Sequence, residues 1–169
     1  MATIGYTSIG ASTEGAGTAN GTNNPAGLLI TMPTAGLVSK ITARVLTMIS
    51  GIPAGSGSST AKIYAGSAGS LGSLVATSAS NTFNGTETWV DFTFSSPVSV
   101  TATTYWIEFS GLGGGGPGSA YGNIKYDTGG GSNTGYSKSD LGVPTYNTKQ
   151  YSLYATYTLP VPSGFLTFM

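Results

Sequence analysis

The sequence predicts an all-β fold, in which two antiparallel sheets of about eight strands in total pack face to face as a sandwich. Three observations support this. Apolar and polar residues alternate with a period of two in several segments. Glycine, proline and asparagine clusters separate these segments. The apolar residues of 37–49 also fit the i, i+4 spacing of a helix, but the β-branched content and the flanking proline and glycine favour a strand. Short strands of this kind are typical of sandwiches, and a jelly roll is the arrangement we expect.

The clearest strands are expected at residues 37–49 and 88–94. In the first segment, the alternate residues expected to face the core include Leu37, Ile41, Val45 and Ile49. In the second, they are Val90, Phe92 and Phe94, with Trp89 on the opposite face. Further strands are expected at 27–32, 61–65, 73–80, 98–101, 104–110, around 123–126 and at 150–159. Pro97 is expected to interrupt the chain between two of them.

The chain of 169 residues is the size of one domain. Residues 1–26 are poor in apolar side chains, so we expect an N-terminal arm or leader there, followed by the sandwich at 27–159. Residues 160–169 are expected to form an extended apolar tail, because proline breaks a helix and has no N–H to donate to a neighbouring strand. An apolar tail is costly in water, so it should dock on its own domain or on a partner subunit. The expected docking residues are Phe165, Leu166, Phe168 and Met169.

Charge is scarce in this chain. Only 7% of residues are charged, six basic against six acidic, whereas a typical soluble domain has about 25%. No basic patch is available to neutralise phosphates, so we expect no nucleic-acid partner. A net charge of zero lets copies approach one another closely, so a homo-oligomer is expected.

The chain shows neither a membrane span nor an export signal. No run of about 20 apolar residues exists, and the N-terminus lacks the basic and apolar regions of a signal peptide. A virion protein released by lysis is consistent with this pattern. A piece of a longer extracellular or cell-surface protein is the alternative.

The residue types present do not favour catalysis. Histidine and cysteine are absent, which excludes nucleophilic triads and metal sites built on imidazole or thiolate. Glu87 and Asp91 lie four residues apart on one expected strand, about 13 Å, which is too far for glycoside hydrolysis. Glu108 could supply a second carboxylate if the two strands paired. We expect no enzyme and no cofactor.

A calcium site is a weaker possibility. Asp127 and Asp140 could supply oxygen ligands together with loop carbonyls. The spaced aspartates of a calcium loop are absent, however, and turn-forming aspartates are the simpler interpretation.

Aromatic residues are the candidates for contact with a ligand or receptor. They are Trp89, Trp106, Tyr121, Tyr126, Tyr136 and Tyr146. The tyrosines lie in or beside Gly/Ser/Asn loops, a composition that resembles antibody binding loops. The alternative is that they cap the ends of the core. The two tryptophans could stack on a sugar, pack under a neighbouring subunit or lie beneath a loop.

A succession of strand segments carries a resemblance to known domains. The segments are GLVSKI (36–41), KIY (62–64), LVATS (74–78), WVDFTF (89–94), PVSV (97–100) and TYWI (104–107). Over roughly residues 28–157 the chain resembles jelly-roll domains of phage virion proteins and of bacterial surface proteins.

The resemblance implies a non-catalytic protein of the virion surface: a capsid decoration (cement) protein, a head fibre or a tail appendage. Its partner would be a capsid or tail protein of the same virion. The alternative that it implies is a carbohydrate-binding module or receptor-binding domain that contacts a cell-surface glycan through exposed aromatic residues.

Overall fold

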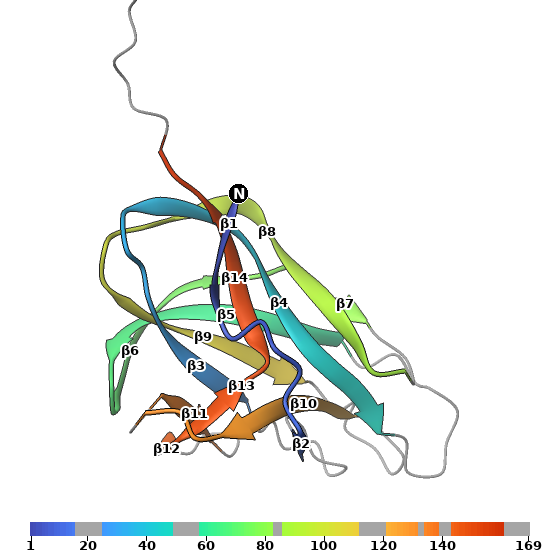
Figure 1. The fold of residues 1–169 in the computed structure, drawn as a ribbon. Coiled ribbons are helices and arrows are strands. Elements are labelled where there is room, and N and C mark those ends of the chain that lie inside the picture. Colours follow the sequence, from blue (N-terminus) through green and yellow to red (C-terminus); the bar gives the residue numbers. More distant parts are fainter. Residues whose placement is uncertain are drawn as a thin grey trace, which may run out of the picture.

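A computed structural model describes residues 1–15, 25–48, 58–82, 86–111, 121–131, 134–138 and 143–160. Within them the chain forms fourteen strands in two antiparallel sheets, so the predicted all-β sandwich is confirmed (Figure 1). Six of the strands have four residues or fewer, which explains why there are more than the eight expected. The jelly-roll connectivity stays a prediction. No helix in these ranges is long and apolar enough to cross a membrane.

The first sheet, sheet A, has the strand order β1-β14-β4-β10-β13, with β8 beside β4 and β2 beside β10. Its strands are β1 (Ala2–Gly5), β2 (Ser12–Gly15), β4 (Gly36–Met48), β8 (Thr88–Val100), β10 (Tyr121–Thr128), β13 (Lys149–Tyr151) and β14 (Leu153–Thr158).

The second sheet, sheet B, has the order β12-β11-β3-β9-β5-β6, with β7 beside β5. Its strands are β3 (Ala26–Thr31), β5 (Ser58–Ser67), β6 (Ser70–Thr77), β7 (Asn81–Thr82), β9 (Thr104–Gly111), β11 (Gly135–Ser137) and β12 (Thr145–Asn147).

The core lies between the sheets and is built from alternate residues of the long strands. The predicted inward parity of β8 is confirmed, because Val90, Phe92 and Phe94 are buried. The rings of Phe92 and Phe109 meet at 5.6 Å between centroids and so join sheet A to sheet B. Each large apolar side chain buried in this way contributes about 1.5–3 kcal/mol of transfer free energy.

The predicted core parity of β4 is wrong at its first residue. Leu37 is 39% exposed, whereas its neighbour Val38 is 1% exposed. The pairing of β4 with β8 shifts between Val38 and Lys40, and an irregularity of this kind changes which face the following residues occupy. From Ile41 onward the predicted parity holds, since Ile41 and Val45 are buried. Ile49 lies outside the described residues.

Pro97 does not divide two strands, as the sequence suggested, but lies within β8. Val98 pairs with Val38, and Thr93 pairs with Lys40. Residues 94–97 of β8 therefore lie opposite the single residue Ser39 of β4. Pro97 falls in this unpaired stretch, where its missing N–H costs no ladder hydrogen bond.

The expected N-terminal arm is also corrected. Residues 2–5 form β1, which pairs with β14, and residues 12–15 form β2, which pairs with β10. Ile4 packs against the core. Apolar content was the wrong criterion here, because an open sheet edge offers backbone hydrogen bonds whatever the side chains are.

The shifted pairing in β4 gives a stability prediction. Replacing Val38 with Ala should cost about 2 kcal/mol, because two buried methyl groups are lost and a small cavity remains. The matched change at the exposed neighbour, Leu37→Ala, should stay within about 0.5 kcal/mol. Urea unfolding of both variants measures the difference. Equal losses would contradict the assignment of Val38 to the core.

Candidate functional site

Every basic side chain of the chain pairs with a carboxylate. The pairs are Lys40–Asp91, Arg44–Glu87, Lys62–Glu108, Lys125–Glu87, Lys138–Glu108 and Lys149–Glu14, with N···O distances of 2.5 to 3.8 Å. The shortest pair, Lys40–Asp91, is also a hydrogen bond. No lysine or arginine side chain is therefore left without a carboxylate partner.

The most buried of these pairs centre on Glu108 in β9, whose side chain is 0% exposed. Tyr136 donates a hydrogen bond of 2.5 Å to Glu108 Oε2, and Lys138 Nζ lies 3.0 Å from the same oxygen. Oε1 accepts no hydrogen bond from the described residues, but it lies 3.4 Å from Lys62 Nζ. A buried carboxylate needs such partners, because an unpaired charge in the interior is very costly.

Strand register explains why these residues meet. Glu108 is opposite Gly27 on one side and Lys62 on the other, and Gly27 is opposite Tyr136 in β11. Side chains in one such row lie on the same face of a sheet. A Cβ at Gly27 would collide with the Tyr136 ring, so glycine makes room for the phenol to reach Glu108.

An aromatic group covers the same outer face of sheet B. Trp106 contacts Tyr136 at 5.1 Å and Tyr146 at 5.6 Å between ring centroids. Its Nε1 donates to the carbonyls of Ser67 and Ser70. A Cβ at Gly66 would lie 2.7 Å from Trp106 Cδ1, so that glycine also makes room for a ring.

Two predicted contact residues are therefore corrected. Trp106 and Tyr136 are each 0% exposed, so neither can touch a ligand or receptor. Trp106 donates to the carbonyls of the turn at 67–70, which agrees with the interpretation that it lies beneath a loop. Tyr136 is buried against Trp106 and Glu108, a setting that the sequence did not suggest. Glu108, Lys62, Lys138 and the two glycines were not singled out from the sequence as members of such a cluster, because their proximity depends on strand register.

Burial and the Glu108 carboxylate raise the pKa of two phenols, those of Tyr136 and Tyr64. The ring centroid of Tyr64 in β5 lies 5.2 Å from Lys138 Nζ. Burial, then the charge of Glu108, raises the pKa of Tyr64 to about 12, and the same causes raise that of Tyr136 further above its ordinary value of 10.0. Both phenols therefore stay protonated to a higher pH than an exposed tyrosine does. The unfolded chain loses these protons near pH 10 and the folded chain keeps them, so their effect is to lower the free energy of unfolding as the pH rises above 10.

The other predicted aromatic residues are more accessible. Trp89 is half-buried on the outer face of sheet A, with Tyr154 at 5.4 Å and the Arg44 guanidinium 5.9 Å from its ring. Tyr126 is half-buried beneath Lys149, whose Nζ lies 4.7 Å from the ring centroid. Tyr146 is also half-buried, and its hydroxyl accepts the N–H of Leu71.

Five predicted site residues cannot be placed. Phe165, Leu166, Phe168, Met169 and Asp140 lie outside the described residues, and nothing is described of the Tyr121 side chain either.

Asp127 has partners within the chain. Tyr6 donates a hydrogen bond of 2.5 Å to one of its oxygens, and the N–H of Ala11 donates to the other at 2.8 Å. The Ala11 N–H, followed by Tyr6, holds the pKa of Asp127 below its ordinary value of 3.8. The described part of the chain contains no group of three acidic, histidine or cysteine side chains that could hold a metal ion.

The carboxylates do not form a catalytic pair in the described residues. Glu87 and Asp91 lie on or beside β8 in sheet A, whereas Glu108 lies on β9 in sheet B. Because β9 pairs with β3 and β5, the approach of Glu108 to β8 by strand pairing does not occur.

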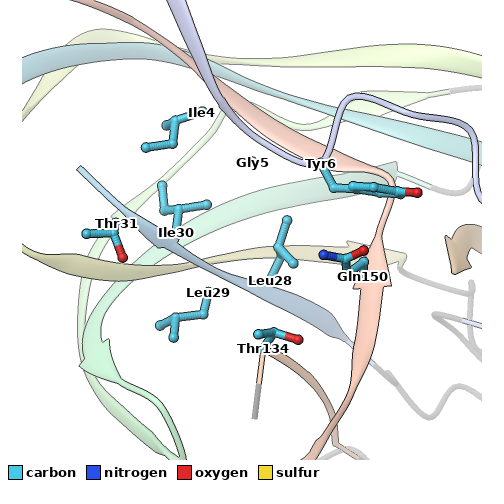
Figure 2. Close-up of a pocket in the computed structure, with 9 residues that line it drawn as sticks. All are labelled: Ile4, Gly5, Tyr6, Leu28, Leu29, Ile30, Thr31, Thr134 and Gln150. Carbon is cyan, nitrogen blue, oxygen red and sulfur yellow. The ribbon is translucent and has the colours of Figure 1, made fainter. Parts of the chain in front are cut away.

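A groove lies between β1 of sheet A and β3 of sheet B (Figure 2). Residues 4–6 and 28–31 line it, together with Thr134 and Gln150, and its volume is about 280 Å³. Figure 2 shows Ile4 at the same end as Ile30, and Tyr6 at the end with Gln150. All of these lining residues are uncharged. We name it the β1–β3 groove.

The Glu108 cluster gives the second prediction. Replacing Glu108 with Ala leaves Lys62 and Lys138 partly buried without a counter-charge, so unfolding should become easier by about 3–5 kcal/mol. Asp91→Asn is the matched control, because it removes the half-exposed charge pair with Lys40, worth less than about 1 kcal/mol, and keeps an acceptor for the buried Thr42 hydroxyl. Urea unfolding at neutral pH measures both. If the Glu108 variant has a free energy of unfolding no lower than that of the Asp91 variant, the cluster adds no stability.

Comparison with known proteins gives no relative from which a role could be carried over. No family model matches the chain, and no curated protein matches it. Its function has to be inferred from the geometry itself.

Proposed function

We propose that the chain is a non-catalytic structural protein of a phage virion. It would be a capsid decoration (cement) protein, head fibre or tail appendage that acts through contacts with other proteins at the virion surface. One observation carries the proposal: all six basic side chains are paired within the chain. Because these charges are paired, contacts between copies would depend mainly on uncharged side chains and backbone edges, which suit close packing of many copies.

The distribution of carboxylates supports a non-catalytic role. Glu14, Glu87, Asp91 and Glu108 are each paired with a cation, and Asp127 accepts two hydrogen bonds. A general acid or base must reach a substrate in a pocket. The β1–β3 groove is lined by uncharged residues and contains no carboxylate or lysine.

The resemblance to jelly-roll virion domains agrees with this proposal. The docking elements would be the C-terminal tail, with Phe165, Leu166, Phe168 and Met169, and the partner would be a capsid or tail protein. A tail of this kind would attach each copy to the particle while the sandwich stays intact.

The virion role is tested with purified particles of the phage that encodes the chain. Antibodies against the chain should label the particle surface in electron microscopy. A protein lacking residues 160–169 should keep its all-β circular-dichroism spectrum but fail to join the particles. Absence of the chain from purified particles would overturn the virion role, and normal incorporation of the truncated protein would overturn docking through the tail.

The alternative, a carbohydrate-binding module or receptor-binding domain, is favoured by one observation. Trp89 and Tyr154 form a half-buried aromatic pair on the outer face of sheet A, a surface on which a sugar ring could stack.

A glycan array separates this alternative from the virion role. Under the alternative, Trp89→Ala should reduce glycan binding by at least tenfold, because the loss of one aromatic platform costs about 1.4 kcal/mol or more. Leu74→Ala on the exposed edge strand β6 is the matched control and should bind normally. An array with no bound glycan, or with binding that does not depend on Trp89, would contradict glycan binding at the Trp89–Tyr154 pair.

A further inference from the structure

Two sheet edges face the β1–β3 groove. β1 ends sheet A and pairs with β14 alone among the described strands. β3 pairs with β9 along its length but with β11 only through residues 26–28. Leu29 N–H then bonds to the Thr134 carbonyl, and no strand in the described ranges pairs with this edge beyond that point. An extended segment in the groove would find backbone donors and acceptors there.

The walls of the groove define the chemistry of its occupant. Ile4 and Leu29 are half-buried and supply apolar surface beside the buried Leu28 and Ile30, and every lining residue is uncharged. The volume of about 280 Å³ is at or below the usual range of about 300–1,000 Å³ for small-molecule sites. The groove is therefore better suited to one or two apolar side chains of a β-strand than to a separate ligand.

We propose that the β1–β3 groove binds residues 163–169 of a second copy of this chain. The inference rests on the proposed function and changes one part of it: the tail is received by another copy of this chain in the assembly, rather than by a capsid or tail protein. The segment, SGFLTFM, has four apolar residues and no charged side chain. It also has no proline, so its backbone can pair as a strand after the two prolines at 160 and 162.

The path of β14 indicates a second copy rather than the same chain. Tyr157 pairs with Ala2 and Ala155 pairs with Ile4, so the chain leaves β14 past the start of β1 and moves away from the groove. Leu159 precedes a proline, which favours extended backbone where the chain leaves β14. The absence of net charge lets a second copy approach.

Cysteine cross-linking tests the proposal cleanly, because the full chain contains no cysteine. One protein carries Thr31→Cys in the groove, and another carries Thr167→Cys in the tail. After mild oxidation of the mixture, a disulfide-linked heterodimer should form at least tenfold faster than with Thr93→Cys as the groove-side partner. Thr93 is the matched control because it is exposed on β8 of the other sheet.

The double variant, Thr31→Cys with Thr167→Cys in one chain, separates the two sources of the tail. Linked dimers and larger species support a second copy. Monomers that lose both thiols would show that the chain's own tail fills the groove, and a rate no higher than with Thr93→Cys would show that the tail does not bind there. Either result overturns the proposal.

A groove variant separates this inference from the proposed function. Leu29→Arg places a charge at the groove and should abolish the cross-link while leaving the circular-dichroism spectrum unchanged; an undiminished cross-link in this variant would overturn the proposal. If the tail deletion blocks particle attachment but the cross-link never forms, the groove proposal fails alone. If the cross-link forms but the chain is absent from virions, the proposed function fails alone.

Discussion

The structure depends on the burial of β9 on both of its faces. Alternate residues of an antiparallel strand usually divide between core and solvent. In β9 the outward residues Trp106 and Glu108 are as buried as the inward Ile107. A buried carboxylate is tolerated only with partners, so Lys62, Lys138 and Tyr136 must be brought to it. The short strand β11, which supplies Tyr136, is therefore part of what stabilises the middle of sheet B.

Alternation along the sequence was enough to predict the sandwich and the inward-facing residues Val90, Phe92 and Phe94 of β8. It could not predict the Glu108 cluster, because its members come from four strands and meet only through register. The row that joins Tyr136, Gly27, Glu108 and Lys62 crosses more than a hundred residues of sequence. No local pattern marked the cluster, because Trp106 and Glu108 alternate on β9 in the same way as Trp89 and Asp91 do on β8, where Asp91 is exposed.

The failures at Leu37 and in residues 1–26 have a common physical cause. The sequence pattern describes side chains, whereas both outcomes are decided by backbone hydrogen bonds. An irregular pairing opposite β8 moved Leu37 to solvent, and the open edges of β14 and β10 recruited β1 and β2. Similarly, Pro97 is compatible with a strand because the ladder is interrupted at that position.

The difference between side-chain pattern and backbone hydrogen bonding also bears on how a partner is recognised. Where all six cations are used inside the chain, charge steering has little to act on, and partner choice must come from shape, apolar contact and backbone pairing. Backbone pairing is available at sheet edges, and the β1–β3 groove places two edges against an apolar floor. A partner selected there would be recognised as an extended, uncharged strand. Its affinity would then depend little on salt, in contrast to partners held by surface ion pairs.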